Sequence, residues 1–456
     1  MSSTLRPPGM LGKRLVIGLL FLLLLLPAIQ AYWPLVPMGA LGGVTAEAAA
    51  PQFNWEALKT GRLQPALETY TTDHLGFRPW LVRLYNQLVF SGFSITRSPD
   101  VLLGKNGVLF MPTYIQAYLG KDVMTADDVR YQVIRIKMLQ HDLAQHGINF
   151  LFVLAPSKAR FEPENLPPHS PPTTSKYDLF TRQAEASHLP LLDCVKLFAA
   201  WKRTKPYPLY PRGGTHWSGY ATTLIADTLL RQLEASGHYK LRDFRPVGRP
   251  DIVRASDLLR GTDNDLGQTL NLLWRKEITP LAYPHIHFEP LRAGQSQPSL
   301  LLVSDSYCWG LTQFVPYLQQ EFATDSRIWF YNRTAFAPDS SDKTNGARKE
   351  GEVEKLNLRQ ELEKRRTVVL MMTEFNLPEC EFWFTSQVFQ LYHPFTDADH
   401  AAIDQLAAKY QQEYLTGSWD AKALEPEHAA YLAHRNALQY YEAEQMTRLL
   451  AASSAP

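Results

Sequence analysis

Cysteine is scarce in this chain, which has only three among its 456 residues: Cys194, Cys308 and Cys380. Three cysteines are too few for a disulfide framework, and they do not have the spacing of metal ligands. Neither a disulfide-stabilised scaffold nor a metal site is therefore indicated. If the chain is exported, its composition still allows one disulfide, although buried free thiols are the simpler expectation.

The chain also has almost no net charge, because 46 basic residues balance 45 acidic residues and leave a charge of +1. Overall charge therefore gives no reason to expect binding to nucleic acid. The content of 45% hydrophobic and 20% charged residues is ordinary for a globular protein and argues against disorder. A chain of 456 residues can form one large domain or two of ordinary size.

A long hydrophobic run is present only at the amino terminus. Arg6, Lys13 and Arg14 precede an apolar stretch at 15–29, in the order that is typical of an export signal. The apolar character continues weakly to Met38, which is long enough to span about 30 Å of hydrocarbon. Because no Lys or Arg follows until Lys59, we expect the body of the protein to lie outside the cytoplasm.

This amino-terminal segment could either remain on the protein or be cleaved. We expect residues 1–38 to remain as an uncleaved membrane anchor, followed by a linker rich in Gly and Ala at 39–52. The alternative is a signal peptide that is cleaved, since small residues at Ala31 and at Ala46 to Ala48 would each suit a signal peptidase.

Short local elements are expected after the linker. Apolar residues recur at helical spacing in one segment, at Leu81, Leu84, Tyr85 and Leu88. Residues 101–110 are expected to form a β-hairpin, because Asn106-Gly107 can supply the positive φ of a tight turn.

Helices then alternate with buried strands. Thr125 and Asp128 have the spacing of a capping box, and Gly147 is placed to end the helix that they begin. A continuous apolar run follows at 148–154, and further strands are expected after a helix at 176–187. These further strands are expected at 189–195, 300–304, 327–331 and 367–372. Such alternation predicts an α/β domain of three layers with a mostly parallel sheet, which we expect to occupy residues 53–392.

One of these strands leads directly into a polar turn. Leu300 to Val303 are branched and apolar, and Ser304-Asp305-Ser306 follows. Open α/β sheets bind ligands at the carboxyl ends of their strands, so Ser306 could present a hydroxyl and a backbone N–H there. The alternative is that these polar residues only cap the next helix.

A histidine that could act as the base for this serine lies 90 positions earlier. His216 follows Gly213-Gly214-Thr215 in a glycine-rich loop, just before a helix that is expected to end at Gly237. Loop histidines on α/β scaffolds are better functional candidates than histidines on an apolar helix face. Ser306 and His216 could therefore form a nucleophile and base pair across the sheet edge.

The tail after Pro394 changes character. Thr396 and Asp399 are expected to cap a helix that runs to about residue 412, and Pro426 is expected to begin another. Strand-period runs are not present, so we expect 393–456 to be a helical extension that covers the domain or binds a partner, not a carbohydrate-binding β-sandwich.

Several motifs together resemble a known family. In chain order they are Gly76-Phe77-Arg78, the turn at 103–110, Val153 to Lys158, Tyr210 with Thr215-His216-Trp217, Val303 to Tyr307, and Val368-Val369-Leu370 with Glu374. Their order resembles the SGNH-hydrolase-like O-acetyltransferase domain of the proteins that acetylate alginate and related bacterial exopolysaccharides. The resemblance covers about 54–391.

The resemblance implies a three-layer SGNH-hydrolase-like fold and a division of roles. Ser306 would be the nucleophile that carries an acetyl group, His216 its general base, and Asp305 a supporting residue of the serine motif. A membrane-bound O-acyltransferase-type partner would supply the acetyl group, with no bound cofactor or metal. A sugar hydroxyl of a secreted polysaccharide would accept it, at the periplasmic face of the bacterial inner membrane or, if the signal is cleaved, in the periplasm.

The sequence departs from the family pattern at Gly214, where the family motif Asp-x-His-Trp has aspartate. The third member of such a triad fixes the imidazole tautomer and stabilises the imidazolium. Three outcomes are open: another carboxylate replaces it, a dyad works without one, or the protein is a degenerate member that binds polysaccharide or assembles a complex. The candidate carboxylates are Asp193, Asp263 and Asp265. A periplasmic carbohydrate esterase would use the same residues.

Three further residues could contribute to substrate or oxyanion binding. Asn332 and Arg333 follow the strand expected at 327–331, and Tyr307 follows the candidate nucleophile. A guanidinium there could bind a carboxylate or the oxyanion, although a surface ion pair is an equal alternative for Arg333.

Overall fold

The computed structural model describes residues 10–43, 47–122, 124–274, 278–342, 345–379, 381–417 and 425–453. Arg6, Ala46, Cys380 and part of the predicted linker lie outside these residues. The chain forms two compact units, Met1–Leu103 with Leu266–Glu277, and Gly104–Asp265 with Ile278–Pro456. The boundaries predicted at 38, 52 and 392 divide the chain by its motifs, whereas these units divide it by compactness. The predicted boundaries therefore stay a prediction.

The first unit is helical. It contains α1 (Met10–Tyr32), α2 (Trp55–Lys59), α3 (Leu63–Asp73), α4 (Arg78–Phe93) and a short strand β1 (Leu102–Leu103). Within the described residues, one helical segment is long and apolar enough to cross a membrane, Gly12–Tyr32. The predicted amino-terminal apolar segment is therefore confirmed as a helix, α1, which ends at Tyr32.

The second unit is built on a sheet of seven strands in the order β12-β11-β10-β9-β13-β3-β4. The strands β10, β9, β13, β3 and β4 are parallel, whereas β11 and β12 form an antiparallel edge. The bounds are β3 Asn149–Ala155, β4 Leu191–Asp193, β9 Leu300–Ser304, β10 Arg327–Phe330, β11 Thr334–Pro338, β12 Ala347–Glu352 and β13 Thr367–Thr373. The predicted mostly parallel sheet is confirmed.

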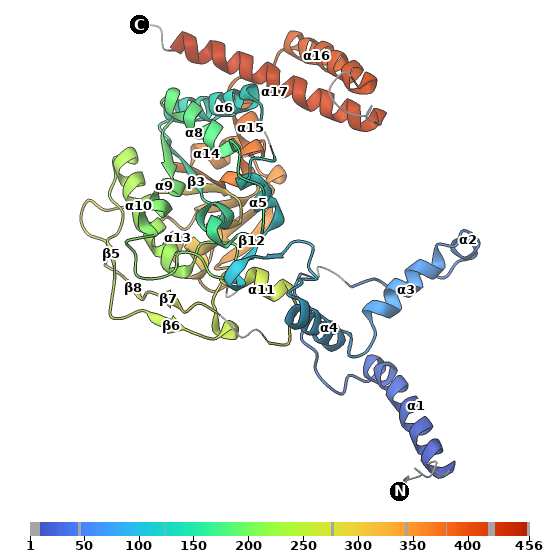
Figure 1. The fold of residues 1–456 in the computed structure, drawn as a ribbon. Helices are drawn as coiled ribbons and strands as arrows, with labels where there is room; N and C mark the ends of the chain where they lie inside the picture. The colour runs from blue at the N-terminus through green and yellow to red at the C-terminus, as the bar shows by residue number, and fades with distance from the viewer. Residues whose placement is uncertain are drawn as a thin grey trace. The chain divides into compact units, whose positions relative to one another are not determined.

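Alternate residues of each parallel strand enter different cores, which makes the unit three-layered. In β3, Leu151, Val153 and Ala155 belong to one core, and Phe150, Phe152 and Leu154 to the other. The first core includes α9 (Cys194–Trp201), α10 (Gly219–Gly237) and α13 (Tyr317–Glu321), and the second includes α6 (Ala126–Gln145), α8 (Lys176–Ala186) and α15 (Phe384–Tyr392). Figure 1 shows α6 and α8 together on one side of the sheet and α10 on the other. Both faces of the sheet are thus covered, as a parallel sheet requires.

Local sequence signals account for several element ends. Thr125 and Asp128 form the predicted capping box of α6, and Asn106 and Gly107 both have positive φ. The strand predicted at 189–195 is shorter, because the side chain of Asp193 caps α9 and residues from Cys194 onward are helical.

An insertion between α10 and β9 was not predicted. It pairs β5 (Phe244–Pro246) with β8 (Ile286–Phe288), and β6 (Asp251–Val253) with β7 (Leu281–Tyr283), all antiparallel. Strands of three residues are too short for hydrophobic periodicity to reveal them.

The carboxyl-terminal extension is helical, as predicted. The capping box of Thr396 and Asp399 begins α16 (Asp397–Thr416), and α17 (Pro426–Ser453) follows. The remaining short elements are η1 (Lys105–Gly107), β2 (Leu109–Phe110), α5 (Pro112–Tyr118), α7 (Lys158–Phe161), η2 (Pro163–Asn165), η3 (Ser256–Leu258), α11 (Asp265–Thr269), η4 (Ser306–Trp309), α12 (Gly310–Gln313), η5 (Val353–Lys355), α14 (Leu358–Glu363) and η6 (Glu374–Glu379).

Candidate active site

The candidate nucleophile lies at the carboxyl end of a central strand. β9 ends at Ser304, and Ser306 is the first residue of η4, which Asp305 caps by accepting a hydrogen bond from the Tyr307 N–H at 3.0 Å. The other oxygen of Asp305 accepts hydrogen bonds from the N–H of Thr373 at 2.7 Å and from Asn376 Nδ2 at 2.8 Å. Asp305 thus joins the serine turn to the end of the neighbouring strand β13, which fixes the backbone of Ser306.

Ser306, His216 and Asp265 form a continuous hydrogen-bonded chain. His216 Nε2 lies 2.8 Å from Ser306 Oγ, and His216 Nδ1 lies 2.7 Å from Asp265 Oδ2. A carboxylate can only accept, so Nδ1 carries the proton and Nε2 is free to accept the hydroxyl proton of Ser306. The second oxygen of Asp265 accepts the Thr215 N–H at 2.8 Å, which fixes the carboxylate relative to the histidine loop.

Gly214 leaves space for the segment that carries this carboxylate. A Cβ at position 214 would lie 2.7 Å from the carbonyl oxygen of Thr262 and 3.0 Å from the carbonyl carbon of Asp263. Real Cβ contacts are not that short, so a side chain here would displace residues 262–263. The absence of a side chain at 214 therefore leaves room for residues 262–263, which directly precede Asp265.

A buried lysine holds the loop before His216. The Lys158 ammonium donates to the backbone carbonyls of Pro211 at 2.5 Å, Arg212 at 3.0 Å and Gly214 at 2.8 Å, and Lys158 is 1% exposed. These bonds satisfy carbonyls that would otherwise be left unpaired in the interior. The sequence singled out Lys158 only as part of a motif, because a lysine that caps a distant loop has no local signal.

The other two candidate carboxylates have other hydrogen-bond partners than His216. Asp193 caps α9 and accepts a hydrogen bond from the Tyr177 hydroxyl at 2.9 Å. Asp263 is fully buried and accepts a hydrogen bond from the Tyr283 hydroxyl at 2.7 Å. Burial raises the pKa of Asp263 to about 8, so this carboxyl is largely protonated near neutral pH.

The three residues considered for substrate or oxyanion binding do not come together at Ser306. Tyr307 is fully buried and donates its hydroxyl proton to the Thr215 carbonyl at 3.0 Å, so it supports the histidine loop and does not reach a substrate. The Asn332 amide donates to the carbonyl of Phe382 at 2.9 Å, which makes it a loop anchor. Arg333 is exposed, and among the described residues no hydrogen bond joins its guanidinium to the site.

Tyr331 is a site residue that the sequence did not reveal. Burial and the charge of Asp305 raise the pKa of its hydroxyl to about 12, and the interactions of that hydroxyl with the side chain and the backbone of Ser306 partly oppose the rise. Its backbone has φ 51°, in the left-handed region that is rare for a bulky residue. Its role could not be read from the sequence because it depends on the turn after β10.

The described side chains offer no metal site. In the ranges that the structure describes, no three His, Cys, Asp or Glu side chains are arranged to hold a metal ion. The hydrogen-bonded chain itself allows a proton transfer from Ser306 Oγ to His216 Nε2, with Asp265 beside the imidazolium that forms.

Comparison with known proteins identifies the family of the chain. A family model described as "SGNH hydrolase-like domain, acetyltransferase AlgX" matches residues 101–333, which is more than half of the chain. The chain therefore belongs to the AlgX-type family of SGNH hydrolase-like acetyltransferases. No curated protein matches the chain.

Similar solved structures include three bacterial proteins. The O-acetyltransferase domain of Pseudomonas putida AlgJ is 19% identical, with 62% of this chain and 93% of that chain covered and a TM-score of 0.41. Pseudomonas aeruginosa AlgX is 11% identical, with 61% and 67% covered and a TM-score of 0.37. Bacillus cereus PatB1 with a sulfonyl adduct is 12% identical, with 61% and 97% covered and a TM-score of 0.37.

Proposed function

We propose that this protein is an O-acetyltransferase that carries an acetyl group on Ser306 and transfers it to a sugar hydroxyl of a secreted bacterial polysaccharide. The observation that supports this most strongly is the hydrogen-bonded chain from Ser306 through His216 to Asp265. Serine is a weak nucleophile unless a base accepts its proton, and an imidazole needs a fixed tautomer to do so. A carboxylate in the right place favours a catalytic member of the family over a degenerate one.

The reaction divides into two half-reactions. In the first, His216 Nε2 accepts the Ser306 proton while Oγ attacks the acetyl carbonyl, and the imidazolium then gives that proton to the leaving group of the donor. In the second, His216 accepts the proton of the sugar hydroxyl, whose oxygen attacks the acetyl-serine. The ester bond to Ser306 breaks, and the imidazolium returns the proton to Oγ.

The negative charge of each tetrahedral intermediate needs fixed donors. The Ser306 N–H at the start of η4 is the first donor that we assign, and the adjacent Tyr331 hydroxyl is the second. Burial raises the pKa of Tyr331 to about 12, so its protonated hydroxyl can donate in the physiological range.

We infer the surroundings of the reaction from the family and from the apolar helix α1. A membrane-bound O-acyltransferase-type protein would supply the acetyl group, and no cofactor would be bound. The apolar segment Gly12–Tyr32 would anchor the protein to the inner membrane, with the second unit at the periplasmic face.

The test compares acetylation in four forms of the full-length protein. Wild type, Ser306→Ala, Asp265→Asn and Asp193→Asn are incubated with p-nitrophenyl acetate, and intact mass and nitrophenol release are measured. Wild type should gain one acetyl group, and Ser306→Ala should gain none at the site. Asp265→Asn should lose up to about 10⁴-fold in rate, as when a triad carboxylate is neutralised. Asp193→Asn is the matched control, because asparagine can still cap α9 and His216 is not its neighbour.

Two outcomes would contradict the proposal. Equal acetylation of wild type and Ser306→Ala would exclude Ser306 as the acceptor. Release from the acetyl-enzyme that an added oligosaccharide does not accelerate over water would favour an esterase and contradict the transferase assignment.

A further inference from the structure

The helix α4 exposes its apolar face, unlike an ordinary helix on the surface of a globular protein. A helix on a globular protein normally presents apolar residues to the core and polar residues to water. In α4 one face is exposed and apolar, and we call it the α4 stripe: Trp80 (54% exposed), Leu81 (50%), Leu84 (42%), Tyr85 (53%) and Leu88 (63%). The helical spacing of Leu81, Leu84, Tyr85 and Leu88 is evident from the sequence, but the structure places this stripe away from any core.

The polar face of α4 is used to hold the helix in the first unit. Arg83 donates to the carbonyls of Gly39 at 3.0 Å and Ala40 at 2.6 Å. Asn86 donates to the Leu270 carbonyl at 2.9 Å, and Gln87 accepts the Trp274 N–H at 3.0 Å. Because these bonds fix the rotation of the helix about its axis, the stripe is held outward by specific contacts.

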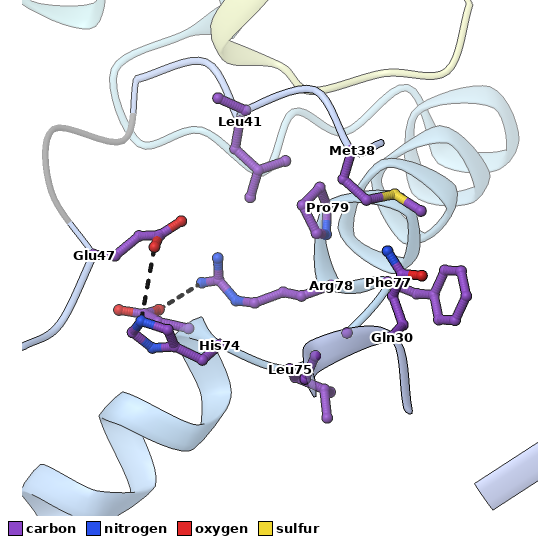
Figure 2. A pocket seen from close by; sticks show the side chains of 13 residues that line it. Gln30, Met38, Leu41, Glu47, His74, Leu75, Phe77, Arg78 and Pro79 are labelled. Carbon is purple, nitrogen blue, oxygen red and sulfur yellow. Dashed lines mark ion pairs between the residues drawn. The ribbon is translucent and has the colours of Figure 1, made fainter. Parts of the chain in front are cut away.

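The start of α4 is packed directly against the apolar helix α1. A Cβ on Gly76 would lie only 2.1 Å from the Pro27 carbonyl oxygen and 2.7 Å from the Ala31 nitrogen. Gln30 of α1, Met38 and Phe77 line one pocket, where the chain enters α4 (Figure 2). Arg78 pairs with Asp73 at 3.1 Å in the same region, which further fixes the start of the helix.

The position along α1 at which the start of α4 packs defines the depth of α4 in a bilayer. The apolar segment Gly12–Tyr32 has 21 residues, which is about 30 Å of helix and matches the hydrocarbon thickness. Tyr32 and Trp33 are exposed at its outer end, where aromatic residues mark the membrane interface. Pro27 to Ala31 precede Tyr32 by at most about 8 Å along the axis, which is the depth of a helix that lies in the interface.

We propose that α4 lies in the outer interface of the bilayer that holds α1, with the α4 stripe against the acyl chains. Leucine, tryptophan and tyrosine are the residues that interfacial helices use on their apolar face. The guanidinium of Arg97 lies 5.5 Å from the centre of the Tyr85 ring. A positive charge next to the stripe could therefore bind lipid phosphates. This second membrane contact would hold the first unit on the surface and limit the rotation of α1.

Fluorescence quenching by lipids tests this directly. The full-length protein is reconstituted in vesicles of phosphatidylethanolamine and phosphatidylglycerol that contain a lipid with a nitroxide near the head of its acyl chain. An environment-sensitive dye is attached to Leu84→Cys or Leu88→Cys, in a background with Cys380→Ser. Cys194 and Cys308 are buried and should not react. The control places the dye at the exposed Lys205→Cys in the second unit.

Quenching several times greater at positions 84 and 88 than at 205 is the expected result. Quenching at 84 and 88 that does not exceed that at 205 would overturn the proposal. It would point to a second copy of this chain as the occupant of the stripe, since these vesicles contain no other protein. The outcome is separable from the acetyltransferase proposal, because acetylation of Ser306 in the same labelled samples is measured independently and also reports that the second unit is folded.

Discussion

Asp265 reaches His216 from a segment whose backbone passes directly over Gly214. At the residue scale this explains how the family motif can lose its aspartate without loss of a carboxylate beside the imidazole. The two positions are linked, because a side chain at 214 and the observed path of residues 262–263 exclude each other. Placing aspartate back at 214 should therefore not restore the ordinary motif.

The link between positions 214 and 265 can be tested by adding Gly214→Asp to the Asp265→Asn variant. We expect no recovery of acetylation and a free energy of unfolding about 1–3 kcal/mol lower than that of Asp265→Asn, as for an overpacked core. Denaturant unfolding and the acetylation rate are the measurements. Gly92→Ala is the control, since a methyl group there meets no atom within 4 Å. Recovered acetylation with undiminished stability would refute the linkage.

Asp263 should make stability depend on pH. Its folded pKa of about 8 lies above its usual value of 3.8, so between these values the folded state holds a proton that the unfolded state has lost. Stability should therefore fall as pH rises through this window, by up to about 1.4 kcal/mol per pH unit, and change little above it. Asp263→Asn should flatten that slope in denaturant unfolding, whereas the exposed Asp257→Asn should keep it. Equal slopes in wild type and Asp263→Asn would contradict the assignment.

At the scale of elements, three pieces of the chain meet at the site, each from a different connection of the fold. η4 presents Ser306 at the end of β9, the loop before α10 presents His216, and the segment after β6 presents Asp265. Lys158, in the short helix after β3, joins a fourth connection to the histidine loop. The site is precise because these connections are tied to one another.

Lys158→Met tests whether the lysine positions the histidine loop. Hydrogen bonds from a charged donor contribute about 1.5–3 kcal/mol each, so losing three should lower the free energy of unfolding by several kcal/mol. We also expect the first-order acetylation step of bound donor to slow more than donor binding weakens, because His216 would lose its position. Stopped-flow rates against donor concentration separate the two effects. Lys202→Met, at a more exposed ammonium, is the control, and equal behaviour of the two variants would count against a positioning role.

At the scale of the whole molecule, the catalytic unit is extended by helices that pack on it. In α17, Met446 joins a small core with Met138 of α6 and Phe389 of α15. Glu442 of α17 is fully buried and accepts hydrogen bonds from Ser386 and Gln390 of α15. These contacts make the extension part of the second unit and supply no site residue.

Met446→Ala should therefore lower stability without affecting chemistry. We expect a loss of about 2–5 kcal/mol in the free energy of unfolding, as for other buried methionines, because a cavity replaces the thioether. The acetylation rate of the folded protein should stay at the wild-type value. Tyr431→Ala, at an exposed position of the same helix, should change neither quantity. Unchanged thermal unfolding of Met446→Ala would indicate that α17 does not contribute to the fold.

The sequence by itself determined the features that depend on neighbours in the chain. Apolar runs specified β3, β9 and β13, and capping residues specified the starts of α6 and α16. The polar turn after β9 made Ser306 a candidate nucleophile, and the loop with His216 and the order of the motifs made it the best one. Motif order identified the family. The apolar runs and caps are local signals, so they can be read from one strand or one helix turn at a time.

Only the tertiary structure decided which groups meet. Asp193, Asp263 and Asp265 were equivalent in the sequence, and the path of an insertion of very short strands selects Asp265 as the partner of His216. The exposure of the α4 stripe and the contact of Tyr331 with Ser306 likewise depend on packing between distant segments. Periodicity shows that a helix has an apolar face, but not what that face contacts, because the partner is chosen by the fold as a whole.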